Sequence, residues 1–114
     1  MLYINNNFFS TKVAKTDKEI QEGMSFKMFD DDFNSMIFLL KPDNHCFWMK
    51  NCIIPLDIIF IKNKKISKIF HNCKPCPSQN CEKFCHTGDM VLEVLGGTCE
   101  KLGIKENMDI NFLK

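Results

Sequence analysis

The sequence contains no arginine, so lysine supplies all fifteen of its basic side chains other than histidine, and the formal net charge is only +1. Proteins that read nucleic-acid sequence rely on arginine for bidentate contacts with guanine and phosphate. We therefore expect no sequence-specific nucleic-acid partner. Long apolar runs are also missing, since Pro55 and Asp57 interrupt the most apolar stretch, Cys52 to Ile61. This stretch is shorter than the roughly 18 apolar residues of a membrane helix, so no membrane partner is expected.

The first residues, Met1 to Asn7, lack a basic stretch that leads into a long apolar run. This pattern predicts no secretory signal and a cytoplasmic location. Seven cysteines are an odd number and too few for a disulfide scaffold. Cys46, Cys52 and Cys99 lie among apolar or helical neighbours, and we expect them to be buried packing thiols.

Length and composition are those of an ordinary globular domain. The chain has 114 residues, of which 45% are hydrophobic and 25% charged, and it contains no internal repeat or low-complexity tract. A chain of this length cannot build two separate cores. We therefore expect a single domain over residues 1–114.

Short apolar segments separated by turn residues predict an α+β fold, mainly antiparallel β, with two short helices. The expected strands are 8–15, 36–40, 47–51, 56–61, 65–70, 90–95 and 108–112, with Lys41 to Asn44 as a turn and Asn63-Lys64 as a hairpin connection. A capping box, Thr16 to Glu19, predicts a helix from Asp17 to Met24, and Thr98 is expected to cap a second helix that ends at Gly103. Because exposed sheet edges are a liability, six to seven short strands are expected to form a small curled sheet or barrel.

Several strings of the sequence carry a family resemblance. They are Thr16-Asp17-Lys18-Glu19, Gly23-Met24-Ser25-Phe26, Met36-Ile37-Phe38, the continuous stretch from Phe47 to Ile61, Val91 to Gly97 and Lys101 to Ile104. Together they resemble the domain of unknown function family 192 (DUF192) over nearly the whole chain. The resemblance implies a compact, strand-rich domain and assigns no reaction. Relatives usually have Thr where this chain has Cys52, and many carry a Pro-Cys pair and a later Cys in the loop after residue 73.

Asp57 stands alone among apolar side chains in the segment from Pro55 to Phe60. An unpaired buried carboxylate costs several kcal/mol, so Asp57 must have partners. We expect these to be Lys50 and Asn51, with the Trp48 indole N–H as a further donor. One interpretation is a structural network that also uses backbone amides of the turn from Asn51 to Pro55.

The other interpretation is a ligand-binding pocket. Trp48, Lys50, Asn51 and Asp57 would line it, and Phe47 would add apolar contact area. His45 could add a group that titrates near neutrality, although its place after a turn favours an exposed loop.

A second cluster places four thiols and an imidazole within fourteen residues: Cys73, Cys76, Cys81, Cys85 and His86. The spacing permits a zinc site, a disulfide-exchange turn at Cys73–Cys76, or a structural loop whose thiols are free or oxidised. Zinc is the one cofactor that the sequence suggests, and otherwise none is expected.

The motifs of common enzymes are missing. Gly96-Gly97 lacks the rest of a phosphate-binding loop, and none of the five serines lies in a nucleophile elbow. The balance favours a small binding or accessory domain, for a small molecule or a protein, whose site lies around Phe47–Asp57. Two alternatives stay open: an enzyme that uses Lys50 and Asp57, or the carboxylate pair Asp57 and Glu93, in acid–base chemistry, and a zinc-stabilised interaction module over Cys73–His86.

Overall fold

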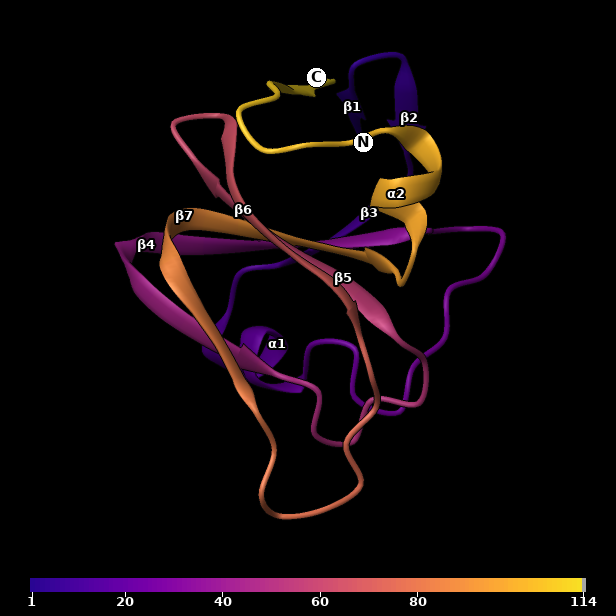
Figure 1. Ribbon diagram of the computed structural model, residues 1–114, viewed down its shortest axis with the longest axis vertical. Helices are drawn as coiled ribbons and strands as arrows, with labels where there is room; N and C mark the ends of the chain where they lie inside the picture. Colours follow the sequence, from indigo (N-terminus) through magenta and orange to yellow (C-terminus); the bar gives the residue numbers. More distant parts are fainter. Residues whose placement is uncertain (114) are drawn as a thin grey trace.

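A computed structural model describes residues 1–113, which form two β-sheets and two short helices (Figure 1). The elements are β1 (Leu2–Ile4), β2 (Asn7–Phe9), β3 (Thr11–Ala14), α1 (Asp17–Glu22), β4 (Ser35–Trp48), β5 (Leu56–Lys62), β6 (Lys65–Cys73), β7 (Lys83–Leu95), α2 (Thr98–Leu102) and β8 (Ile110–Phe112). The expected α+β class with two short helices and mostly antiparallel strands is confirmed. Over residues 1–113, no helix is long and apolar enough to cross a membrane.

The larger sheet has the strand order β3-β4-β7-β5-β6, and only the β3–β4 pair is parallel. The smaller sheet has the order β2-β1-β8 and is antiparallel. The larger sheet is open, with β3 and β6 at its edges, so the barrel alternative is wrong. The hairpin between β5 and β6 is confirmed, because Asn63 and Lys64 both adopt the positive φ angles, 52° and 62°, that a tight hairpin turn needs.

The larger sheet is covered on both faces, which explains why β5 is apolar on both sides. Alternate residues of a strand point to opposite faces. Ile59 and Ile61 belong to the core cluster that includes β1, β8 and Cys99 of α2, whereas Ile58 and Phe60 belong to the cluster on the opposite face. Figure 1 shows α2 and the small sheet at the top of the molecule and α1 below the large sheet. We call these two sides the α2 face and the α1 face.

β4 and β7 are longer than the sequence predicts. The segment from Lys41 to Asn44, expected as a turn, continues β4, and its register with β7 shifts between Leu39 and Asp43. Such an irregularity takes up extra residues without ending the strand. Pro42 is tolerated because β3 pairs only with residues 35–38 of β4, so the missing N–H of Pro42 lies beyond that partner.

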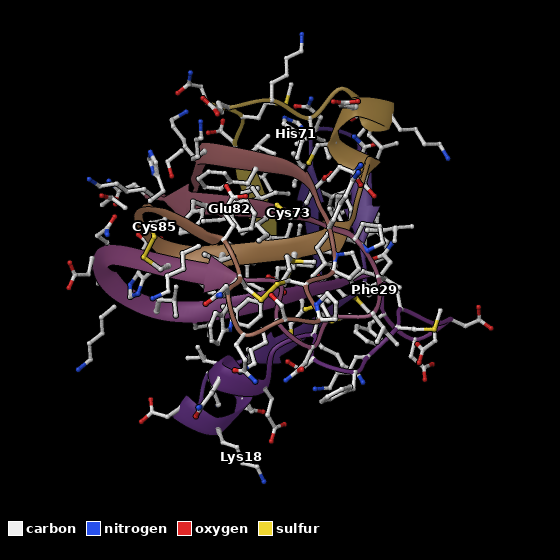
Figure 2. All side chains as sticks on the ribbon, turned by 60° about the horizontal axis from the view of Figure 1, so that its bottom comes forward. Lys18, Phe29, His71, Cys73, Glu82 and Cys85 are labelled. Atoms are coloured by element: carbon white, nitrogen blue, oxygen red, sulfur yellow. A yellow bond between two sulfur atoms is a disulfide. The ribbon has the colours of Figure 1, made fainter. Side chains whose placement is uncertain are left out.

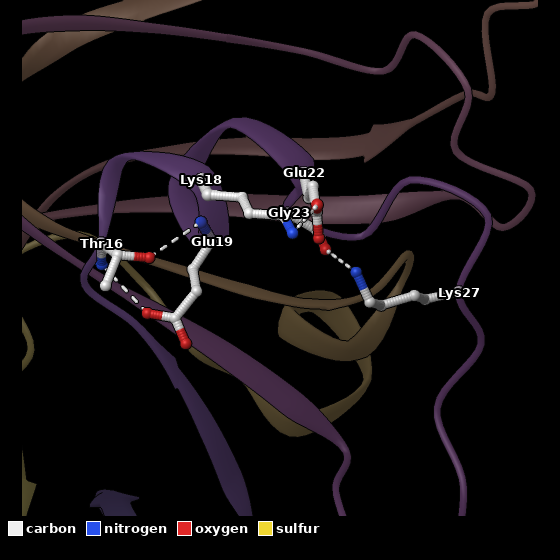
Figure 3. A network of polar contacts seen from close by, with 6 residues as sticks. All are labelled: Thr16, Lys18, Glu19, Glu22, Gly23 and Lys27. Atoms are coloured by element: carbon white, nitrogen blue, oxygen red, sulfur yellow. Dashed lines mark hydrogen bonds and ion pairs between the residues drawn. The ribbon is translucent and has the colours of Figure 1, made fainter.

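The two helices begin differently. The expected capping box of α1 is confirmed: Thr16 Oγ1 accepts from the Glu19 N–H at 3.1 Å, and Glu19 Oε1 accepts from the Thr16 N–H at 3.0 Å (Figure 3). The N-cap of α2 is Gly97 and not Thr98, and Gly97 offers no side chain for capping. The cap of α2 must therefore come from elsewhere in the chain.

Four of the seven cysteines form disulfides. Cys46 and Cys85 are directly opposite in the β4–β7 pair and are joined, and Cys76 is joined to Cys81 in the loop after β6 (Figure 2, with Cys85 labelled). The expectation that Cys46 is a packing thiol is wrong, because its register with Cys85 places the two sulfur atoms within bonding reach. Cys99 is buried and free as expected, Cys73 is also buried and free, and Cys52 is free and half-buried.

The zinc and disulfide-exchange interpretations of the Cys73–His86 cluster are not supported. Cys76 pairs with Cys81 and not with Cys73, while Cys85 is held on β7 by Cys46. His86 lies opposite His45 in the β4–β7 pair. Within the described part of the chain, no three His, Cys, Asp or Glu side chains are placed to hold a metal ion. The structural-loop interpretation, with oxidised thiols, fits this arrangement.

The cysteine assignment predicts three reactive thiols per chain, those of Cys52, Cys73 and Cys99, when unreduced protein is denatured and alkylated. Mass spectrometry of the alkylated protein counts them, and metal analysis of protein purified without chelator is expected to give zinc well below one per chain. Alkylation of Cys76 or Cys81 before reduction, together with stoichiometric zinc, would restore the metal site.

Candidate functional site

Asp57 is fully buried on β5, and its carboxylate is bound only to backbone amides. Oδ1 accepts from the N–H groups of Asn72, at 2.7 Å, and Gly97, at 3.1 Å, while Oδ2 accepts from the N–H of Cys99 at 2.8 Å. The amides of Gly97 and Cys99 belong to the start of α2, which Gly97 leaves uncapped. Asp57 therefore supplies the cap of α2 from a different strand.

The expected partners of Asp57 were wrong. Its register partner on β7 is Val94, a member of the α2-face cluster, so the Asp57 side chain points to the α2 face. Lys50 instead donates to Gln79 Oε1 at 3.0 Å and lies over the Trp48 ring at 5.3 Å. Backbone amides satisfy Asp57, as the structural interpretation expected, but they come from Asn72, Gly97 and Cys99.

The chain around Asp57 is packed too closely to be a pocket. A Cβ atom at Gly96 would lie 2.5 Å from Asn72 Oδ1 and 3.0 Å from the Pro55 Cβ, so a larger residue there would displace the Asn72 side chain and press on Pro55. The Asp57 carboxylate also helps raise the pKa of the Cys99 thiol, for which burial is the main cause. We assign Asp57 a structural role.

A second buried carboxyl group lies on the other face of the same sheet. Glu93 of β7 is 3% exposed and pairs with Met36 and Ile58, which both belong to the α1-face cluster. Glu93 and Asp57 therefore point away from each other, and the acid–base pair that the sequence suggested does not form. The pair of Lys50 and Asp57 is divided in the same way.

Glu93 differs from Asp57 in having no partner. Within residues 1–113 no hydrogen bond or salt bridge to its carboxyl group is present, and burial is the sole cause that raises its pKa, to about 8 from the usual 4.5. At neutral pH the group is therefore protonated and uncharged. The Glu93 oxygens are not completely sealed, since among the described residues Asp89 Oδ1 is the one fully buried side-chain oxygen or nitrogen without a partner. A carboxyl group that no protein group satisfies but that opens to a cavity leaves its hydrogen bonds to whatever occupies the cavity.

Glu93 opens into a cavity of about 230 Å³, which we call the Glu93 cavity. Its wall combines three aromatic side chains with polar groups from four segments of the chain. Besides Glu93, the lining includes Gly23, Met24 and Ser25 after α1, Phe38 and Leu40 of β4, His45, Cys46, Phe47 and Trp48 further along β4, and Lys50 and Cys52 after it. The cavity is larger than the 150 Å³ that accommodates benzene in a designed apolar cavity, so it has room for a compact organic molecule.

The sequence-predicted site residues fall into two groups. Trp48 and Lys50 line the Glu93 cavity and also an adjoining hollow of about 670 Å³, where Asn51 joins them. His45, expected in an exposed loop, is half-buried and lines the cavity. Asp57 lies on the other face and takes no part. A binding role for Trp48, Lys50 and Asn51 stays a prediction.

Local backbone contacts hold the mouth of the cavity in place. Phe26 N–H donates to the Asn51 carbonyl at 2.8 Å, and Ser25 forms an isolated β-bridge with Cys52. Phe26 and Asn51 adopt positive φ angles of 59° and 63°, which a bulky residue such as Phe rarely does. These links fix the segment after α1 against the end of β4 and shape the opening.

The basic side chains near the cavity are engaged by carbonyl groups. Lys27 Nζ donates to the Gly23 carbonyl at 2.9 Å (Figure 3), and Lys50 is bound to Gln79. His45 Nε2 lies 2.6 Å from the Lys41 carbonyl oxygen. Burial first and the ionised form of Glu93 second raise the pKa of the Cys52 thiol to about 12, so its protonated form is favoured at neutral pH.

Comparison with known proteins places the chain among uncharacterized relatives. The family model DUF192, described as "Uncharacterized ACR", matches residues 2–112. A protein of unknown function from Novosphingobium aromaticivorans is 34% identical, with a TM-score of 0.80, over 91% of this chain and 75% of that one. A "putative transcription regulator" from Sinorhizobium meliloti is 25% identical, with a TM-score of 0.78, over 89% and 79%. No curated protein matches the chain in sequence.

Replacing Asp57 by alanine is expected to destabilise the fold by about 3 kcal/mol or more, because three backbone amides, that of Cys99 fully buried, lose their acceptor. Asp57→Asn keeps one carbonyl acceptor and should cost less. Asp109→Ala is a matched control, since Asp109 is exposed and pairs with Lys65 at the surface. Urea unfolding measures all three, and an Asp57→Ala loss no larger than that of Asp109→Ala would refute the capping role.

Glu93 predicts a pH dependence of stability. The folded chain holds the Glu93 proton up to about pH 8, whereas the unfolded chain releases it near 4.5. Raising the pH across this window therefore favours unfolding, with a slope of about 1.4 kcal/mol per pH unit. Glu93→Gln, which has no proton to lose, should lack this component. Urea unfolding at pH 5, 6.5 and 8 compares the two, and parallel curves for both proteins contradict the assignment.

Proposed function

Because the chain belongs to the DUF192 family, described only as uncharacterized, we propose its function from the site itself: a binding domain that takes a small organic molecule in the Glu93 cavity. The observation that carries the proposal is the Glu93 carboxyl group, buried and unpartnered at a cavity wall. If position 93 served only to pack the core, an apolar side chain would be more stable there, because it would fill the space without the cost of burying a carboxyl group. A polar group that converges on a cavity at the cost of stability is typical of a small-molecule site.

The rest of the wall supports this role. Phe38, Phe47 and Trp48 provide apolar contact area, while Ser25, His45 and Lys50 provide polar groups at the mouth. A few convergent polar groups in a mainly apolar, preformed cavity are typical of small-molecule sites. Three of the wall's segments are fixed by β4, by β7 and by the backbone links to Ser25 and Phe26, so the cavity is preorganised.

The name of the Sinorhizobium meliloti relative suggests regulation of transcription as another role. Direct reading of DNA is not favoured in this chain, because it has no arginine and a net charge of only +1. The proposal therefore concerns ligand binding alone.

The two disulfides bear on the location of the protein. Structural disulfides persist chiefly in oxidising compartments, and both pairs here have at least partly exposed sulfur-bearing residues. We therefore propose an oxidising environment, in place of the cytoplasmic location expected from the sequence.

Neighbouring leucines on β4 provide a test. Leu40 lines the Glu93 cavity, whereas Leu39 is 41% exposed and does not line it. Leu40→Trp is expected to fill the cavity and Leu39→Trp to leave it open. The two proteins and the wild type are compared by thermal shift against amines, carboxylic acids, sugars and nucleotides of known identity.

At least one of these compound classes is expected to stabilise the wild type and Leu39→Trp but not Leu40→Trp. A ligand at one hundred times its Kd adds about 2.7 kcal/mol, which raises the Tm of a domain of this size by roughly 10 °C. Ser25→Tyr serves as a second blocking variant if Leu40→Trp does not fold. Equal stabilisation of blocked and open proteins, or no stabilisation by any class, would refute the proposal.

A further inference from the structure

The Glu93 cavity combines one unpartnered carboxyl group with three aromatic side chains. Phe38, Phe47 and Trp48 share its wall with Glu93, and the Phe38 and Phe47 rings are packed edge to face at 5.0 Å between centroids. Aromatic faces attract cations through their quadrupole, and aromatic walls with a carboxylate are the arrangement that recognises organic ammonium groups.

The chain's own cations do not occupy this position. Lys27 and Lys50 are held by the Gly23 carbonyl and the Gln79 side chain, and the half-buried His45 by the Lys41 carbonyl. An ammonium group already contacts one aromatic ring of the wall, because Lys50 Nζ lies 5.3 Å from the centroid of the Trp48 ring. Deeper in the cavity, the Glu93 carboxyl group has no donor among residues 1–113.

From this arrangement we infer that the natural ligand of the Glu93 cavity is a compact primary ammonium compound, whose N–H groups donate to Glu93 and whose carbon body contacts Phe38, Phe47 and Trp48. This inference rests on the proposed function. A primary ammonium supplies the hydrogen-bond donors that the Glu93 carboxyl group lacks, and once Glu93 has lost its proton the two charges balance each other. The volume of about 230 Å³ accommodates a carbon body of about one aromatic ring and a short linker, and a longer body would extend into the adjoining hollow.

The inference requires proton release on binding. In the empty cavity Glu93 is protonated below about pH 8, and a bound ammonium favours its ionised form. The other titratable groups that line the cavity are Glu22, His45, Lys50 and Cys52, while Cys73 feels the Glu93 charge from the same face. Glu22 is exposed and lies 4.0 Å from Lys18. Of these groups, only Glu93 is both buried and without a partner, so the released proton comes from it.

Benzylammonium, benzyl alcohol and benzoate are suitable probes, because they share one carbon body and differ in charge and donor groups. Each is titrated calorimetrically into the full chain at pH 6.5, in two buffers with different ionisation enthalpies. Benzylammonium is expected to bind with release of close to one proton per site, and its affinity should rise by up to about tenfold per pH unit toward pH 8.

Variants assign the effect to Glu93. Glu93→Gln, which keeps the volume of the side chain, should weaken benzylammonium binding by at least about tenfold and abolish proton release. Glu100→Gln removes an exposed carboxylate of α2 on the other face and should change neither. Leu40→Trp should block binding irrespective of charge.

The outcomes separate this inference from the proposed function. If benzyl alcohol or benzoate binds the wild type at least as tightly as benzylammonium, and Leu40→Trp blocks it, the cavity is a ligand site and the ammonium assignment is wrong. If benzylammonium binds equally to the wild type and Glu93→Gln, the assignment is also wrong. If none of the three probes binds the wild type, and no class in the thermal-shift comparison does, both are overturned.

Discussion

The Asp57 carboxylate accepts hydrogen bonds from three backbone N–H groups, and these bonds hold α2 and the end of β6 against the large sheet. The rest of the α2 face is built on this contact. Asn72 lies one residue before the end of β6, and Gly97 and Cys99 lie at the start of α2. A single side chain of the central strand β5 therefore joins an edge strand to a helix. Helix α2 has only five residues and no side-chain cap of its own. These bonds fix the face of the large sheet that the small sheet and α2 cover. The Glu93 cavity lies on the opposite, α1 face.

Asp57 and Glu93, the two buried carboxyl groups of the large sheet, differ in how the cost of their burial is met. Both lie in apolar strands, and both are almost completely excluded from solvent. Asp57 is satisfied by amides, whereas Glu93 is unsatisfied, and burial raises its pKa to about 8. A satisfied group stabilises the fold, while an unsatisfied one reduces its stability. The contrast is the reason why we assign Asp57 a structural role and propose a binding role for Glu93.

Much of the fold could be predicted from local sequence signals. The capping box at Thr16–Glu19, the Asn63-Lys64 hairpin and the doubly buried β5 all follow from short-range chemistry and periodicity. The length of β4 could not be predicted, because Pro42-Asp43-Asn44 has a strong turn preference that pairing with β7 overrides. The Cys46–Cys85 bond depends on the register of strands 39 residues apart, which the spacing of cysteines does not encode. Trp48 and Lys50, which the sequence analysis names as candidate binding residues, line the Glu93 cavity, and their binding role stays a prediction. The sequence analysis considers Glu93 only as a partner of Asp57. The signal that singled out Asp57, a lone acid in an apolar strand, is equally present at Glu93 within residues 90–95.

The account depends most directly on the ionisation of Glu93, which carbon NMR of its side-chain carboxyl group measures between pH 4 and 9. A midpoint near pH 8 that falls when benzylammonium is added is the result that the buried, unpartnered site predicts. A midpoint near the ordinary 4.5 that is indifferent to the amine would mean that water or an unseen donor already satisfies Glu93. In that case the main argument for ligand binding in the Glu93 cavity is lost.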